Sequence, residues 1–271
     1  MQIRRLFLAG IAAIAAAGTI ALASPAAMAQ GAPESALQKV LKSGTLRVGT
    51  TGDFTPMSTR DPATSSYVGH DIDIANALAA DLGVKVEFVA TDWKSLINGV
   101  VSDKYDIAIS GISVTADRAK VAGFTVPYTE FGTVPVVLKK NLSKYNDWAD
   151  IDKADVTVAT TLGTVFDNQA KEYFKTATLK QVEAPAAGFQ EVLAGRATVT
   201  ITSNVDAAGL IQRYPELAIV PVDKARARRP AAFLVAQGDQ VWINFLNTWI
   251  LTKQYQGFFE GLQAKWLGPK G

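Results

Sequence analysis

The sequence predicts an α/β protein of two lobes, each with a mixed β-sheet flanked by helices. Short apolar runs of strand length alternate with longer amphipathic runs, which is typical of sheets with parallel neighbours. This alternation starts again after residue 140, so we expect two successive modules of similar size. The β-branched run TVPVVL (133–138) between them is too apolar for a flexible linker. A strand that crosses between the lobes accounts for it better.

The first module reads as β-α-β-α-β over residues 45–110. Its helix over 70–83 has apolar residues at helical spacing and ends at Gly83, a residue suited to the left-handed turn that terminates helices. The other elements that we expect are strands over 45–51, 84–89 and 105–110 and a helix over 92–101.

The second module repeats this pattern. We expect strands over 155–161, 178–182 and 198–203, and helices over 164–174, 186–196 and 204–214. A strand over 233–237 and aromatic-rich helices over 240–268 follow. The Trp, Phe and Leu side chains of these last helices require a large apolar surface to cover.

Two crossing strands are expected if the chain returns through about residues 228–234, and a hinge between the lobes follows from that arrangement. We therefore assign residues 30–136 and 231–271 to lobe 1, and residues 137–230 to lobe 2.

The first 29 residues read as a cleaved signal peptide. Arg4 and Arg5 precede an uncharged apolar stretch over 6–23, and Ala27-Met28-Ala29 supplies the small residues of a cleavage site. Pro25 and this motif favour cleavage after Ala29 over an uncleaved membrane anchor. Because no cysteine stands near the cleavage point, a lipid anchor is excluded, and the mature chain is expected to be exported and soluble.

The composition excludes several function classes. Export permits disulfides, but the chain has no cysteine, and its single histidine leaves no zinc or redox-metal cluster to propose. We expect no metal and no cofactor. Removing two signal-peptide arginines from the 27 basic residues leaves 25 against 25 acidic ones, so neither nucleic acid nor an anionic membrane is an expected partner.

Three predicted strand ends combine glycine with hydroxyl side chains, over residues 50–56, 110–118 and 160–166. In open α/β sheets ligands lie beyond the carboxyl ends of strands, where backbone N–H groups suit a carboxylate. Arg118 would supply a two-pronged partner for the same anion. The alternative is a plain turn at Ser110-Gly111 with a solvated Arg118. Phe54 and Trp93 are cleft walls or core residues, and His70 is a helix cap or a surface residue.

Taken in order, these pieces resemble a known family. The stretches LRVGTTGDFTPM, YVGHDIDIANALAADLGVKVEFV, DWKSLINGVVSDKYDIAISGISVTADRAKVAGFTVPY and GTVPVV are similar to the family 3 periplasmic solute-binding proteins of polar amino acid ABC importers. The resemblance covers nearly the whole mature chain and is densest up to residue 137. The first lobe is closest to cyclohexadienyl dehydratase-like members, which are periplasmic enzymes on the same scaffold.

The resemblance implies the periplasmic-binding-protein-like (type II) fold, whose two lobes are joined by two crossing strands and close on a ligand. It places Arg118 where the family clamps the ligand carboxylate. Ser110, Gly111 and Ser113 match the neighbouring turn, and Thr164 matches the carboxylate donor of the second lobe. Phe54 falls where an aromatic ring often stacks on the ligand.

Two departures from the family leave the ligand and the activity open. Amino acid binders usually carry an aspartate where this chain has Ser203, so either the ligand lacks an α-amine or neutral acceptors hold the amine. Either Asp206 pairs with the amine in place of that aspartate, or it is only a residue on the surface of the helix. The dehydratases use a glutamate where this chain has Phe166, and only the neighbouring Asp167 remains as a displaced acid.

The sequence therefore predicts a monomeric periplasmic receptor that binds a small carboxylate-bearing metabolite, an amino acid or a related organic acid. An inner-membrane ABC permease is the expected partner. Arg118, Ser113 and Thr164 hold the carboxylate, and Gly111 allows close approach. Phe54, Trp93, Ser110, Phe166 and Ser203 complete the predicted ligand site. The alternative is a dehydratase acting on prephenate or arogenate, with Asp167 as its acid.

Overall fold

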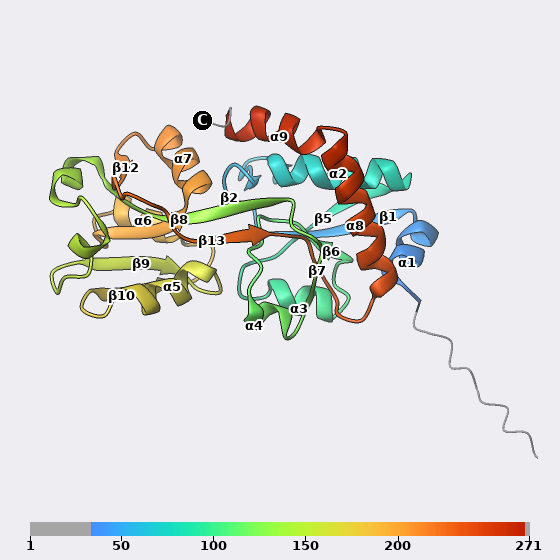
Figure 1. Ribbon diagram of the computed structural model, residues 1–271, viewed down its shortest axis with the longest axis horizontal. Coiled ribbons are helices and arrows are strands. Elements are labelled where there is room, and N and C mark those ends of the chain that lie inside the picture. Colours follow the sequence, from blue (N-terminus) through green and yellow to red (C-terminus); the bar gives the residue numbers. More distant parts are fainter. Residues whose placement is uncertain (1–33, 269–271) are drawn as a thin grey trace, which may run out of the picture. The chain divides into compact units, whose positions relative to one another are not determined.

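The computed structural model describes residues 34–268, so the predicted signal peptide lies outside the described residues. Within this range the chain forms the type II two-lobe α/β fold that the sequence predicts, with a mixed sheet in each lobe (Figure 1). No helix between residues 34 and 268 is long and apolar enough to cross a bilayer.

The first lobe is built on a five-stranded sheet in the order β5-β1-β6-β14-β7. β1 pairs in parallel with β5 and β6, and β14 pairs antiparallel with β6 and β7. A small second sheet, β2-β3-β4, was not expected from the sequence. The strands of these two sheets are β1 (Thr45–Thr50), β2 (Asp53–Phe54), β3 (Ser58–Arg60), β4 (Tyr67–Val68), β5 (Lys85–Ala90), β6 (Ile107–Ala108), β7 (Gly123–Phe124) and β14 (Leu234–Val235).

Helices cover this sheet largely as the periodicity predicts. They are α1 (Ala36–Ser43), α2 (His70–Leu82), α3 (Leu96–Val101), α4 (Ala116–Ala119), α8 (Gln240–Tyr255) and α9 (Phe258–Leu267). Gly83 ends α2 in the left-handed conformation, as expected. α3 begins four residues later than predicted because the Asp92 carboxylate accepts the N–H groups of Lys94 and Ser95 and forms a turn there. Trp242 and Trp249 of α8 are buried, so the aromatic C-terminal segment completes the core.

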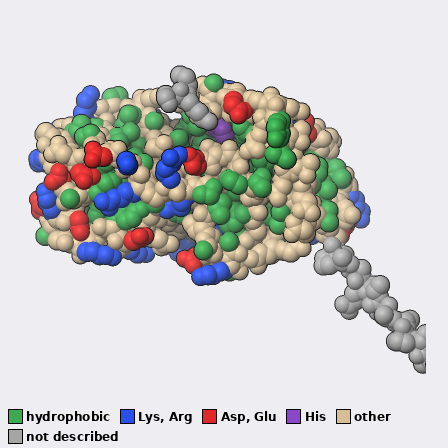
Figure 2. Space-filling view, in the orientation of Figure 1, with side chains coloured by type: hydrophobic (Ala, Val, Ile, Leu, Met, Phe, Trp, Pro, Cys, Tyr) green, Lys and Arg blue, Asp and Glu red, His purple; other side chains and the backbone are tan. Residues whose placement is uncertain are grey.

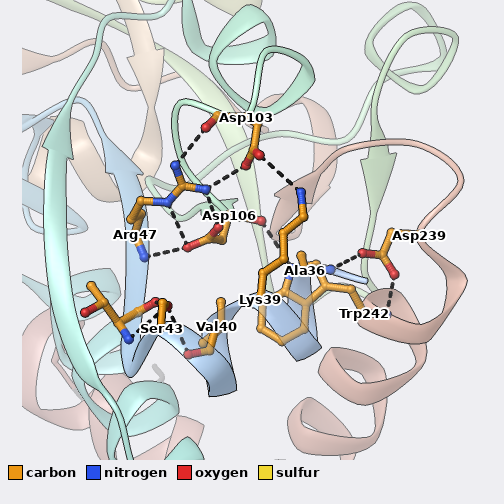
Figure 3. A network of polar contacts seen from close by, with 10 residues as sticks. Ala36, Lys39, Val40, Ser43, Arg47, Asp103, Asp106, Asp239 and Trp242 are labelled. Atoms are coloured by element: carbon orange, nitrogen blue, oxygen red, sulfur yellow. Dashed lines mark hydrogen bonds and ion pairs between the residues drawn. The ribbon is translucent and has the colours of Figure 1, made fainter. Parts of the chain in front are cut away.

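A polar network fastens the N-terminal helix to elements far away in the sequence (Figure 3). The Arg47 guanidinium bonds to the carboxylates of Asp103 and Asp106, each at 2.6 Å. Asp239, the N-cap of α8, accepts from the backbone N–H of Ala36 at 2.6 Å. The Trp242 indole N–H donates to the backbone carbonyl of Asp106 at 3.1 Å. These contacts tie α1, β1, β6 and α8 into one unit.

The second lobe is built on a sheet in the order β10-β9-β11-β8-β12, with β13 also paired to β8. Its strands are β8 (Thr129–Leu138), β9 (Thr157–Thr161), β10 (Thr178–Val182), β11 (Val199–Ser203), β12 (Leu217–Ile219) and β13 (Arg226–Ala231), and its helices are α5 (Val165–Tyr173), α6 (Gly188–Leu193) and α7 (Asn204–Arg213). Two short 3₁₀ helices, Lys139–Lys144 and Trp148–Asp150, follow β8.

The two crossing strands are β8 and β13, which run antiparallel beside each other, with Ala231 opposite Thr129. The far end of β13 also meets the first lobe, since Ala231 forms an isolated bridge with Ser113. The lobe boundaries at residues 136 and 230 stay predictions.

Candidate functional site

A small cavity lies between residues of the two lobes. Its walls combine acidic, aromatic and hydroxyl side chains with small residues: Asp53, Phe54, Trp93, Thr161, Thr164, Phe166, Ala187, Gly188, Phe189, Thr200, Ile201, Thr202, Asp206 and Leu210. The composition suits a small ligand with both charged and apolar parts.

Phe54 and Trp93 form an aromatic wall on the side of the first lobe. Their rings meet edge to face, with centroids 5.8 Å apart. Phe54 is buried and also packs edge to face on Phe131, whereas the Trp93 indole N–H donates to Asp53 at 2.9 Å. Phe54 therefore serves both as core and as cavity wall, and Phe166 of α5 lines the cavity from the second lobe.

Arg118 is a buried cation without a carboxylate partner among the described residues. It lies in the short helix α4, and only 9% of its surface is exposed, so it is not the solvated residue of the alternative interpretation. Nη1 donates to the carbonyl of Ser113 at 3.0 Å, and Nη2 donates across the lobes to the carbonyl of Gly163 at 3.1 Å. Burial, together with the charge of Arg229, lowers the pKa of Arg118 to about 10.

Arg118 does not itself line the cavity, but the carbonyl that it holds belongs to Gly163, directly before the cavity residue Thr164. The guanidinium is therefore bonded to the backbone directly beside a cavity-lining residue. A ligand carboxylate there would replace Gly163 as the partner of Nη2, with a stronger charge-assisted bond.

Hydrogen bonds with Asp71 and Thr51 hold the turn from Ser110 to Ser113 in place. Gly111 has a left-handed φ of +61°, and its N–H donates to the Asp71 carboxylate. The Ser110 hydroxyl is fully buried, 2.8 Å from the Thr51 hydroxyl, and accepts the Thr51 N–H at 3.2 Å. Ser113 contributes its carbonyl to Arg118. In this structure the two serines position the turn, and their hydroxyls do not line the cavity.

The expectation for His70 as a cap or surface residue is wrong. His70 is the first residue of α2, but its side chain is buried, with Nδ1 2.9 Å from an oxygen of the fully buried Asp71. Asp71 also accepts from the Tyr128 hydroxyl at 2.7 Å and from the Gly111 N–H. A buried carboxylate requires several donors, and His70 is held inside as one of them.

We expect Gly111→Ala to destabilise the protein by about 1–3 kcal/mol and to weaken ligand binding, because an added Cβ would collide with the Phe54 ring at a left-handed position. The matched control is Gly195→Ala, where φ is +69° but no atom lies within 4 Å of the added Cβ. Thermal unfolding of both variants measures the difference. Equal losses would show that the contact with Phe54 contributes nothing.

The two hydroxyl residues expected in the second lobe are both helix N-caps. The Thr164 hydroxyl caps α5 by accepting the N–H of Asp167 at 3.3 Å, and it donates to the carbonyl of Thr161 at 2.6 Å. The Ser203 hydroxyl caps α7 by accepting the N–H of Asp206 at 3.0 Å. Thr164 lines the cavity, whereas the buried Ser203 does not.

The carboxylate of Asp167, the acid of the dehydratase hypothesis, accepts three side-chain hydrogen bonds. It accepts from Thr160 at 3.0 Å, Gln181 at 2.6 Å and Lys171 at 2.8 Å. Although burial opposes it, these three donors lower the pKa of Asp167 below its usual value. It stays ionised at neutral pH and does not line the cavity, which favours a structural role.

Asp206 is the acid that does face the cavity. Its side chain is 7% exposed and accepts one side-chain hydrogen bond, from the Thr202 hydroxyl at 2.7 Å. Burial raises the pKa of Asp206 to about 7, and the charge of Asp53 contributes to the rise. From the sequence alone, Asp206 is only one alternative to the missing aspartate, because a position in a predicted helix does not show whether the side chain is buried.

Asp53 is a site residue that the sequence reasoning missed, although the stretch TTGDFTP contains it. It lies beside Phe54 on the cavity wall, and its carboxylate keeps access to solvent. Desolvation by the surrounding protein atoms nevertheless raises the pKa of Asp53. Hydrogen bonds from Thr51 and Trp93 act in the opposite direction and lower it. The cavity thus has two carboxylates on its walls, and the Arg118 guanidinium bonds to the backbone beside one of its lining residues.

These features match a known family. Residues 46–269 match the family described as bacterial extracellular solute-binding proteins, family 3. The chain belongs to this family. Members of this family are binding proteins that act outside the cytoplasm, and the two-lobe fold with its interlobe cavity agrees with that description.

Three relatives illustrate the range of this solute-binding family. Cyclohexadienyl dehydratase of Pseudomonas aeruginosa is 30% identical over 85% of this chain and 85% of its own. The crystal structure of the ancestral amino acid-binding protein AncCDT-1, a precursor of cyclohexadienyl dehydratase, has a TM-score of 0.80 at 38% identity and covers 86% of this chain and 100% of its own. An ancestral arginine-binding protein bound to arginine has a TM-score of 0.74 at 30% identity and covers 83% and 99%.

Proposed function

We propose that this family 3 protein is a periplasmic receptor that binds an α-amino acid, with preference for a cationic side chain, and delivers it to an ABC importer. The observation that carries the proposal is the charge arrangement of one cavity. Arg118, which is buried and has no carboxylate partner among residues 34–268, bonds to the backbone beside the cavity residue Thr164, and the carboxylates of Asp206 and Asp53 lie on the cavity walls. One carboxylate and two cationic groups on the ligand would match these charges.

The proposed roles follow from position. Arg118 holds the ligand carboxylate, assisted by Thr164 at the N-terminus of α5. Asp206 pairs with the α-ammonium group in place of the aspartate that Ser203 replaces, and Asp53 attracts a cationic side chain. Phe54 and Trp93 flank the apolar part of the ligand, where an aromatic face also favours a cation.

Relatives support this assignment. Similar solved structures include an amino acid-binding ancestor and an arginine-binding ancestor with arginine bound. Location in the periplasm, cleavage of the signal peptide after Ala29, a monomeric state and docking to a permease belong to the same proposal. So do the lobe boundaries at residues 136 and 230, between which β8 and β13 would act as the hinge.

Closure of the lobes on the ligand is supported by the contacts that already join them. Besides the bond from Arg118 to Gly163, Lys94 pairs with Glu183 at 2.9 Å. Gly163 lies so close to the backbone of Trp93 and Lys94 that a Cβ would not fit. The glycine is therefore required where the lobes meet.

A thermal-shift screen of amino acids, 2-oxo acids, dicarboxylates and aromatic acids tests the proposal. At about 100 times its Kd, a ligand should raise the Tm by about 5–10 °C for a chain of this length. We expect L-arginine or L-lysine to act in this way and their deaminated analogues to act far less. Stabilisation by a 2-oxo acid without stabilisation by any amino acid would contradict the proposed role of Asp206.

The second candidate is dehydratase activity, which the 30% identical Pseudomonas enzyme favours. Phe166 stands where the resemblance places the catalytic glutamate, and Asp167 is ionised and fully bonded. We therefore expect prephenate and arogenate to yield no phenylpyruvate or phenylalanine above the buffer background. Turnover that Asp167→Asn abolishes would refute the receptor proposal.

A further inference from the structure

A second group of hydrogen-bond donors lies in the second lobe, where β8, β13 and α5 meet. It consists of Thr133 on β8, Gln169 on α5 and Arg229 on β13, and we call it the Arg229 cluster. Thr133 is fully buried, Gln169 is 4% exposed and Arg229 is half-buried. None of the three lines the amino acid cavity.

The hydrogen bonds within the Arg229 cluster do not use all of its side-chain N–H donors. Arg229 Nη2 donates to the Thr133 hydroxyl at 3.3 Å, and this hydroxyl donates to Gln169 Oε1 at 2.8 Å. Because Thr133 already accepts from Arg229, its own proton needs an acceptor, and this fixes the orientation of the Gln169 amide. Gln169 Nε2 therefore faces away from Thr133.

Gln169 Nε2 and Arg229 Nε have no access to solvent and no hydrogen-bond partner among residues 34–268. Trp148 Nε1 is in the same condition, and its ring stacks on Arg226 and meets Tyr173 of α5 edge to face. Three of the four such side-chain atoms in the described range are thus N–H donors in this part of the second lobe. An unsatisfied buried donor costs about 1–3 kcal/mol, so the region calls for an acceptor.

The positive charges of Arg229 and Arg118 also favour a negatively charged acceptor. No carboxylate of the described residues lies within ion-pair distance of Arg229 or Arg118. Burial lowers the pKa of Arg229, opposed by Tyr173 and by the exposed Glu172, and the charge of Arg229 lowers the pKa of Arg118. The charges of Arg118 and Arg229 repel each other, and neither guanidinium has a carboxylate partner among residues 34–268.

The neighbouring Arg228 differs from Arg229, because it is exposed and paired with a carboxylate. Basic and acidic side chains are interspersed on the visible face of the second lobe (Figure 2). Arg228 is exposed and pairs with the exposed Glu130. These arginines lie in the basic stretch DKARARRP (223–230), within which the sequence alone does not separate them. Only Arg229 places a guanidinium nitrogen in the enclosed region.

We propose that the Arg229 cluster binds a small inorganic anion such as chloride, held by Gln169 Nε2 and Arg229 Nε. Both donors are enclosed, which suits a monatomic anion better than an organic acid. The anion offsets the repulsion between Arg229 and Arg118 and stabilises the contact of α5 with β8 and β13. This site is separate from the amino acid cavity and does not depend on the proposed function.

The experiment compares chloride and bromide with gluconate at constant ionic strength, without amino acid, in the wild type and two variants. Chloride at about five times its Kd should raise the Tm of the wild type by about 2–4 °C over gluconate. Arg229→Gln should lose this shift. The matched control Arg228→Gln, one residue away and exposed, should keep it.

A crystal grown in bromide locates the ion directly. An anomalous peak within hydrogen-bond distance of Gln169 Nε2 and Arg229 Nε is the expected result. A water molecule at that position, or equal Tm values in all salts, would overturn the proposal. So would a chloride shift that survives Arg229→Gln but disappears in Arg118→Gln, because the anion would then occupy the amino acid site. Amino acid binding is measured separately, so failure here leaves the receptor proposal standing.

Discussion

Arg118→Met should weaken amino acid binding by about 30-fold or more while leaving the ligand-free protein at least as stable as the wild type. Removing one partner of a buried charge pair costs about 2–5 kcal/mol of binding free energy. Among the described residues, however, the guanidinium bonds only to the carbonyls of Ser113 and Gly163, and the charge of Arg229 repels it. A buried charge without a counterion is unfavourable, so an apolar side chain of similar length removes that cost.

The two effects have opposite signs, and this makes the prediction specific. Calorimetric titration with L-arginine measures binding, and thermal unfolding without ligand measures stability. Arg228→Met is the control, because Arg228 is exposed and pairs with the exposed Glu130. Unchanged affinity in Arg118→Met would remove Arg118 from the site. A large fall in stability without ligand would show that the guanidinium serves the fold.

Asp206→Asn should abolish the preference for an α-amine and remove a pH dependence from ligand binding. Burial raises the pKa of Asp206 to about 7, and an ammonium group would lower it again on binding. Below pH 7 the ligand must therefore displace a proton. We expect the affinity of the wild type to rise up to about tenfold per pH unit toward pH 7 and then to level off.

The same group affects stability in a defined direction. Since the pKa of Asp206 is raised on folding, the folded state binds more protons than the unfolded state between pH 4 and 7, and stability falls as the pH rises through this window. At pH 8 Asp206→Asn should stabilise the ligand-free protein by up to about 4 kcal/mol, the equivalent of a shift from 3.8 to about 7.

Asp167→Asn is the matched control, because Asp167 and Asp206 each follow a hydroxyl N-cap by three residues. The pKa of Asp167 is lowered, so its stabilising effect is present above pH 4 and is lost as the pH falls through its folded-state pKa. Asp167→Asn should therefore destabilise the protein at neutral pH. Urea unfolding at pH 5 and pH 8 distinguishes the variants, and effects of the same sign in both would contradict the assignment of Asp206.

The order of the strands and helices could be predicted from local patterns. Helical spacing of apolar residues and a terminal glycine mark α2, and alternation marks β5. Two of the three strand ends with glycine and hydroxyl residues, 50–56 and 160–166, contribute residues to the cavity, whereas the stretch 110–118 does not line it. The small sheet β2-β3-β4 escaped prediction because its strands are only two or three residues long.

Local sequence patterns were enough to predict the two α/β modules and the turns that follow their strands, since periodicity and turn residues act over a few neighbouring positions. The tertiary structure alone decided which charges are buried. Asp167 and Asp206 share one local motif, yet three donors surround the first and one side-chain donor bonds the second at the cavity. Likewise Arg228 and Arg229 are adjacent, but one is exposed and the other has an enclosed nitrogen. The ionisation and the partners of a side chain depend on groups distant in sequence, which no local pattern records.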